Sequence, residues 1–161
     1  MLKILTLAGG VAGAVALSQF PEFSQQYLQR LSGAVDELRT QVVAFDTLAT
    51  AAGITREEAL AELDGSTFQS GLQAHFGEQV HRYERLSADY TALRQAEPLQ
   101  RLAQFWRFDD PDLAQRTWDD FRPAVPVTTD GLICAGIGFA GGWLALTLLF
   151  GLLMRPFRRF A

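Results

Sequence analysis

The sequence lacks most of the residues on which a catalytic or metal site is built. It contains one cysteine, Cys134, so neither an intrachain disulfide nor a multi-cysteine zinc site can form. Its two histidines, His75 and His81, are six residues apart, whereas a chelating pair on a helix needs a spacing of three or four. No grouping of serine, histidine and aspartate suggests a catalytic triad, and most glycines lie in apolar runs rather than in a phosphate-binding loop. We therefore predict no catalytic residue, no metal ligand, no cofactor and no enzymatic activity.

Positive charge is also scarce. The formal net charge is −4, and Lys3 is the only lysine among the 14 basic residues. All 18 acidic residues lie between Glu22 and Asp130, while four basic residues lie outside that stretch. An acidic middle without a broad basic surface argues against a nucleic-acid partner.

Five aspartates near residue 115 are close enough in sequence to be considered as a cation site: Asp109, Asp110, Asp112, Asp119 and Asp120. A structural role is the preferred alternative. Asp110 precedes a proline and is expected to cap a helix that begins there, with Asp112 in its first turn, where a carboxylate complements the helix dipole.

Residues 131–154 form an apolar run of 24 residues without a charged side chain. A helix of about 20 such residues spans the hydrocarbon core of a bilayer. Thr129 and Asp130 are expected to cap it, and a basic tail at residues 155–161 follows it. We predict a transmembrane helix over 131–154, with Arg155, Arg158 and Arg159 at the membrane interface.

The other apolar run, residues 4–20 near the N-terminus, is shorter and rich in glycine. It resembles a signal peptide, because Lys3 precedes it and Ala14-Val15-Ala16 has the form of a cleavage site. The alternative, which we prefer, is a retained transmembrane helix. Gly9 and Gly13 share one helical face, as do Gly138 and Gly142 in the other run, and such faces allow two helices to pack closely. Because this spacing is common in glycine-rich apolar sequence, each match alone is weak.

The distribution of charge predicts the orientation of the two spans. Lys3 and the three terminal arginines flank their outer ends, while the connecting segment is acidic. By the positive-inside rule, both termini are cytoplasmic and residues 21–130 lie across the membrane. In a bacterial inner membrane, residues 21–130 are then periplasmic.

The segment between the spans has helical periodicity and no strand pattern. Apolar residues recur at alternating steps of three and four, as in a coiled-coil seam: Leu28, Leu31, Val35, Leu38, Val42, Phe45, Ala49 and Ala52. A capping box, Thr55-x-x-Glu58, opens a short helix, and a second long helix ends before Pro98. We predict an all-α fold in which two transmembrane helices bracket an antiparallel helical hairpin, with short helices near the membrane.

The stretch that follows the hairpin is expected to form one amphipathic helix over residues 99–108, then the helix beginning at Pro111, then an extended segment. Trp106 and Trp118 lie here with several phenylalanines. They fit equally well as bundle core or as an aromatic belt at the membrane interface.

Two segments, ALSQFPEFSQQYLQRLSGAVDEL at residues 16–38 and DFRPAVPVTTDGL at residues 120–132, resemble the landmarks of a family of uncharacterised alphaproteobacterial inner-membrane proteins, a domain-of-unknown-function family. The resemblance covers essentially the whole chain. It implies a two-span inner-membrane protein and no known activity.

The leading functional hypothesis is a non-enzymatic membrane protein whose periplasmic hairpin binds another membrane or periplasmic protein, or a second copy of itself, through the seam at Leu28–Phe45. It would serve as an accessory or assembly component of a membrane complex, in which Gly138 and Gly142 could instead pack against foreign helices. A periplasmic sensor-like module without an output domain of its own is the alternative.

Overall fold

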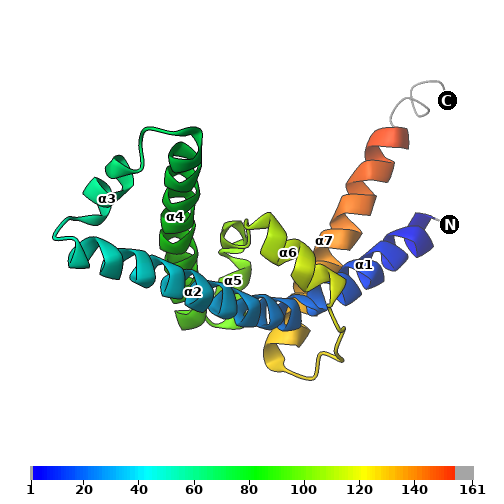
Figure 1. The fold of residues 1–161 in the computed structure, drawn as a ribbon. Coiled ribbons are helices and arrows are strands. Elements are labelled where there is room, and N and C mark those ends of the chain that lie inside the picture. Colours follow the sequence, from blue (N-terminus) through cyan, green and yellow to red (C-terminus); the bar gives the residue numbers. More distant parts are fainter. Residues whose placement is uncertain (1, 155–161) are drawn as a thin grey trace.

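The computed structural model describes residues 2–154, and it is entirely helical over that range (Figure 1). The all-α prediction is confirmed, since no strand occurs among the described residues. The elements are α1 (Leu2–Ser18), α2 (Phe20–Ala51), α3 (Arg56–Glu62), α4 (Thr67–Gln95), α5 (Pro98–Leu102), the 3-10 helix η1 (Phe105–Arg107), α6 (Pro111–Asp119) and α7 (Thr129–Met154).

Helix α1 passes almost directly into α2. Only Gln19 separates them, and Pro21 stands in the first turn of α2. Proline has no N–H to donate, and its ring clashes with the carbonyl four residues earlier in a continuous helix, so the break falls here. The chain bends at this joint, and α2 leads away from the apolar part of the molecule (Figure 1).

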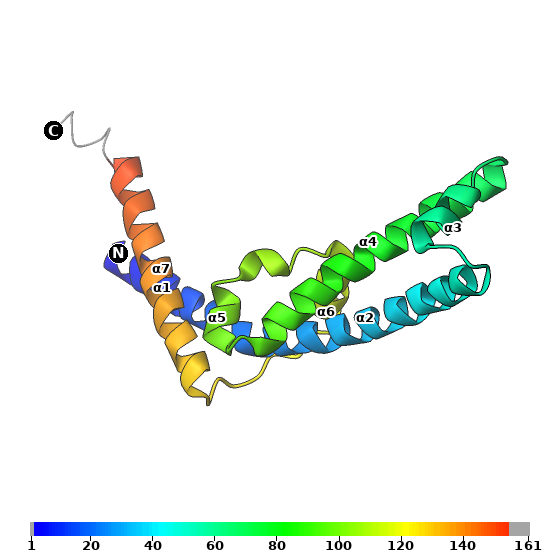
Figure 2. The same cartoon turned by 90° about the vertical axis from the view of Figure 1, so that its left-hand side faces the viewer.

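Helix α2 packs against α4 and α6 to form the main core. Its buried members are Tyr27, Leu28, Leu31, Val35, Leu86, Leu93 and Leu113. The core occupies the first half of α2. Helix α4 diverges from α2 toward the α3 end (Figure 2). There the predicted capping box at Thr55 and Glu58 is confirmed, and α3 is tied to α2 by Arg56, whose Nε donates to Asp46 Oδ1 at 2.6 Å. That bond holds the pKa of the Asp46 carboxyl below its usual value.

The prediction of a single helix over residues 99–108 is wrong. Helix α5 ends at Leu102, and a separate 3-10 turn, η1, begins at Phe105. The change of direction brings the Phe108 ring to 4.7 Å from the Tyr27 ring, so tertiary packing overrides a local pattern that a helix would also satisfy. Residues 121–127, expected to be extended before α7, form neither helix nor strand, and the N–H of Val127 donates to the carbonyl of Val125 in a tight turn.

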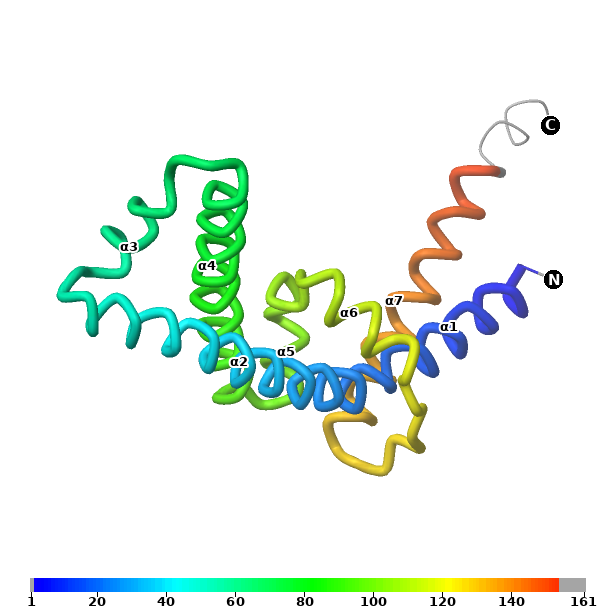
Figure 3. The backbone as a smooth tube through the Cα atoms, viewed as in Figure 1, coloured from blue at the N-terminus to red at the C-terminus, as the bar shows by residue number. Residues whose placement is uncertain are grey.

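Helix α7 begins slightly earlier than predicted. Thr129 and Asp130 belong to its first turn, and the side chain of Thr128 caps it by accepting from the backbone N–H of Gly131 at 3.2 Å. Asp130 complements the helix dipole instead of capping. Helix α7 runs antiparallel to α1, and the Leu2 end of α1 and the Met154 end of α7 lie on the same side of the molecule (Figure 3).

Candidate functional site

The most extensive packing between two helices of the described residues is that of α1 against α7, where glycine faces glycine. A Cβ atom added to Gly13 would clash with the backbone carbonyl of Gly138, and one added to Gly138 would clash with the carbonyl of Gly13. A Cβ atom added to Gly142 would likewise clash with the carbonyl of Gly9, whereas one added to Gly9 would clash with the side chain of Leu146 on α7. The four glycines predicted to pack helices are thus brought together, each against a partner in the other helix.

Other glycines of α7 serve as an internal comparison. A Cβ added to Gly136, Gly141 or Gly151 meets nothing within 4 Å. Apart from Gly131 in the first turn, where a Cβ would meet Pro126, the requirement for glycine in α7 is therefore confined to the face that meets α1, as expected for a helix pair whose backbones approach closely.

The outward faces of this helix pair are apolar. Large exposed hydrophobic side chains include Ile4, Leu7, Val11 and Val15 on α1 and Leu132, Ile137, Leu148 and Leu152 on α7. Two helical stretches are long and apolar enough to cross a bilayer: one begins at Leu2 and continues through the joint into α2, and the other is α7. A soluble protein rarely exposes an apolar surface of this extent, so the two hydrophobic helices indicate membrane association.

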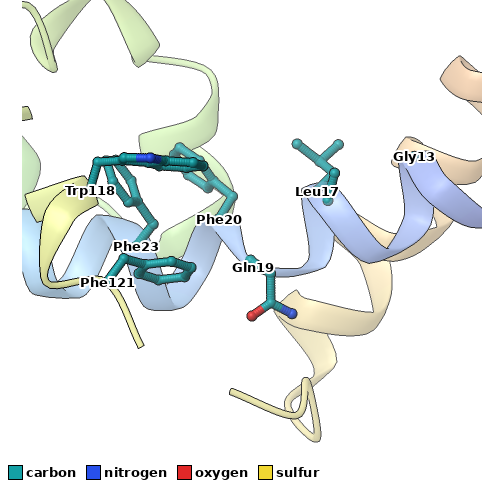
Figure 4. Close-up of a pocket in the computed structure, with 8 residues that line it drawn as sticks. Gly13, Leu17, Gln19, Phe20, Phe23, Trp118 and Phe121 are labelled. Carbon is teal, nitrogen blue, oxygen red and sulfur yellow. The ribbon is translucent and has the colours of Figure 1, made fainter. Parts of the chain in front are cut away.

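An apolar groove lies at the joint between α1 and α2, and Figure 4 shows its two walls. Gly13, Ala16 and Leu17 of α1 form one wall, while Phe20, Phe23, Trp118 and Phe121 form the other, with Gln19 between them. The volume is about 310 Å³. The stacked Trp118 and Phe121 rings, 6.3 Å apart, thereby come to the end of the first apolar helix. Trp118 is 68% exposed, as an aromatic side chain at a membrane interface would be in the absence of lipid.

Trp106 does not join this groove. It is also exposed, and its ring packs against Phe105 within η1. Arg155, Arg158 and Arg159, the remaining members of the predicted membrane-interface set, lie outside the described residues.

The predicted interaction seam is used within the chain. Leu28, Leu31 and Val35 belong to the core formed with α4 and α6, and Leu38 packs against it. Farther along α2, Val42 is buried and the Phe45 ring stacks on Phe76 of α4 at 4.8 Å. A partner of the folded chain must therefore contact a surface other than this seam.

The acidic cluster is divided among separate interactions. Asp110 is buried, caps α6 by accepting from the backbone N–H of Leu113 at 3.1 Å, and pairs with Arg82 and Arg85 at 3.2 and 3.5 Å. Asp120 pairs with Arg30, and Asp119 accepts from Gln115. The carboxylate of Asp110, the most buried of the five, is therefore already paired with two arginines. No group of three potential metal ligands is present within residues 2–154. The capping alternative for Asp110 is confirmed.

Beside Asp110, the Tyr27 side chain is fully buried. Burial, together with the neighbouring charges of Asp110 and Asp109, raises the pKa of Tyr27 to about 12. Tyr27 is thus a member of the core formed by α2, α4 and α6.

The groove at the α1–α2 joint was not evident from the sequence, although Phe20 and Phe23 flank Pro21 in a conspicuous FPEF string. Nothing in the sequence near Trp118 and Phe121 indicates their contact with Phe23, nearly 100 positions earlier. The burial of Arg101, which is only 8% exposed, likewise has no local signal.

Comparison with known proteins gives one match. The family described as "Protein of unknown function (DUF2937)" matches residues 1–159. No curated protein and no solved structure matches the chain.

Proposed function

We propose, for a chain that belongs to this family of proteins of unknown function, that it is a non-enzymatic, two-span protein of the bacterial inner membrane. In this proposal α1 and α7 cross the bilayer, and the helices between them form a periplasmic helical hairpin that binds a membrane or periplasmic protein. The carrying observation is the reciprocal glycine contact of two apolar helices whose outward faces are also apolar.

The orientation is supported by two features. The antiparallel crossing of α1 and α7 places their outer ends on one side of the molecule and α2–α6 on the other (Figure 3). The segment on that second side contains nearly all of the acidic residues, whereas Lys3 stands near the outer end of α1. A cytoplasmic location for the outer ends satisfies the positive-inside rule.

The exposed apolar residues of the hairpin indicate where a protein partner would bind. Val43 and Leu48 of α2 and Phe68 of α4 are 52%, 71% and 74% exposed, although they lie far from the apolar helices in sequence. Large apolar side chains near the α3 end of the hairpin are candidates for anchors in an interface. We place the partner contact at this end of the hairpin instead of at the seam, with Leu48 and Phe68 as its candidate anchors.

A photo-crosslinking amino acid introduced at Phe68 tests the protein-binding proposal in living cells. We expect irradiation to give a discrete adduct, because an apolar anchor becomes buried when its partner binds. An adduct at twice the chain mass of 17.8 kDa identifies self-association, and any other mass identifies a different protein. Substitution of Glu78, an exposed polar residue on α4, is the matched control. Failure of positions 48 and 68 to give more adduct than position 78 would contradict the proposed surface.

A further inference from the structure

Arg101 is a buried cation without an acidic partner among the described residues. Its residue is 8% exposed, and no carboxylate of residues 2–154 lies within ion-pair distance of its guanidinium. Buried arginines are normally paired, because removing a charge from water is costly unless an opposite charge or several hydrogen bonds replace the hydration. The burial of the Arg101 guanidinium therefore depends on its hydrogen-bond partners.

The C-terminal end of α4 provides hydrogen-bond acceptors for part of the Arg101 guanidinium. Nε donates to the carbonyl oxygens of Leu93 and Ala96 at 2.9 and 3.0 Å, and these carbonyls carry the negative end of the helix dipole. Nη1 donates to Gln25 Oε1 at 3.1 Å. Within the described residues Nη2 has no hydrogen-bond partner, so the far edge of the guanidinium keeps donors for an external acceptor.

Arg101 lines a surface pocket together with a second arginine. The pocket has a volume of about 330 Å³ and is lined by Gln25, Leu28, Gln29, Tyr90, Arg94 and Arg101. Arg94 lies over the Tyr90 ring at 5.8 Å from its centroid, a cation–π contact that favours its position at the pocket. Since Gln25 accepts through Oε1, its amide N–H groups remain available as donors. The pocket therefore presents two guanidinium groups and amide donors but no carboxylate.

The donor set matches a phosphate group. Guanidinium groups bind phosphate oxygens with paired, charge-assisted hydrogen bonds, and a site with two of them selects an anion over a neutral polar molecule. A phosphate is also large enough to be reached by side chains from α2, α4 and α5 at once. We propose that Arg101 and Arg94 form a binding site for a phosphate group, supplied by the headgroup of an anionic phospholipid.

The position of α5 supports the lipid as the source. Pro98, at the start of α5, lines a neighbouring pocket together with Pro126, Thr128 and Gly131, which lead into α7. Arg101 lies three residues, about 4.5 Å along a helix, beyond Pro98. The polar headgroup layer extends roughly 5–8 Å beyond the hydrocarbon core on each side. The choice of a lipid rests on the proposed membrane function, whereas the phosphate site itself rests only on the pocket.

The test uses the full chain in nanodiscs of phosphatidylcholine with added phosphatidylglycerol. Native mass spectrometry after release into detergent measures how much phosphatidylglycerol stays bound. We expect Arg94→Gln to lower that retention about tenfold, because it removes a charge-assisted hydrogen bond from the phosphate. Arg39→Gln, at an exposed arginine of α2 outside the pocket, is expected to leave retention unchanged. Arg101→Gln should act in the same direction as Arg94→Gln, and the Arg94 variant decides the matter if the Arg101 variant does not fold.

A second arm separates the two sources of phosphate. Inorganic phosphate is titrated into the protein in detergent without anionic lipid, and the thermal midpoint is followed. If phosphate raises the midpoint of the wild type but not of Arg94→Gln, while phosphatidylglycerol is not retained, the site is supported and its lipid source is overturned. If Arg94→Gln behaves as Arg39→Gln in both arms, the site itself is overturned. Neither result bears on the crosslinking at Phe68, so the two proposals fail separately.

Discussion

Gly142→Leu is expected to separate α1 from α7, while Gly141→Leu leaves them packed. Any side chain at Gly142 collides with the backbone of Gly9, which cannot move aside as a flexible side chain could. A side chain at Gly141 meets nothing within 4 Å. Insertion of bulk into a close-packed contact costs about 3 kcal/mol, which raises the population of the open helix pair about a hundredfold. The two variants have the same composition and differ only in the face of α7 that carries the leucine.

The single cysteine reports this separation without further mutation. Cys134 lies four residues before Gly138, on the same face of α7, and it is 0% exposed. We expect a membrane-permeant maleimide to label it slowly in the wild type and in Gly141→Leu, and about a hundredfold faster in Gly142→Leu. Equal labelling rates in the two variants would contradict the glycine-dependent packing of the spans.

Asp110→Ala is expected to destabilise the helical bundle strongly. The substitution removes the cap of α6 and leaves Arg82 and Arg85 without the carboxylate between them. Loss of a helix cap costs about 1 kcal/mol. Loss of a buried partner of an ion pair costs about 3–5 kcal/mol, a figure that must be reduced here because both arginines are partly exposed. We expect about 3 kcal/mol in total, or a fall in Tm of roughly 6–12 °C.

Two further variants, Asp110→Asn and Asp112→Ala, separate the contribution of the helix cap from that of the charge. Asp110→Asn keeps an oxygen to cap α6 and removes only the charge, so it should cost less than the alanine variant. Asp112→Ala is the matched control, because that side chain is 67% exposed and 3.8 Å from the same Arg82. Exposed pairs contribute roughly 0–1 kcal/mol. Circular-dichroism melts in detergent measure all three, and an Asp110→Ala midpoint no lower than that of Asp112→Ala would exclude a structural role for Asp110.

The parts of this fold that the sequence predicts are those with local causes. Runs without charge predict α1 and α7, the residues at Thr55 and Asp110 predict helix starts, and Pro98 predicts a helix end, since capping and proline act within a few residues. The spacing of Gly9, Gly13, Gly138 and Gly142 even predicts which faces of α1 and α7 meet, because each pair lies on one side of its helix.

Features that depend on distant contacts are not predictable in this way. The break between α5 and η1 is required by the packing of Phe108 on Tyr27, and nothing within residues 99–108 specifies it. The seam of α2 predicts a buried stripe but not whether its own α4 or another protein covers it. Arg101 has the sequence surroundings of an exposed helical arginine, and its burial follows from the position of the α4 C-terminus, five and eight residues earlier in the chain.

The location of residues 21–130 across the inner membrane is the central claim, and fusions to alkaline phosphatase test it most directly. The enzyme folds only where its disulfides form, which in bacteria is the periplasm. We predict high activity for a fusion after Ala52, at the end of α2, and background activity for a fusion after Ala161, at the end of the chain. An inactive fusion after Ala52 together with an active one after Ala161 would contradict the proposed topology.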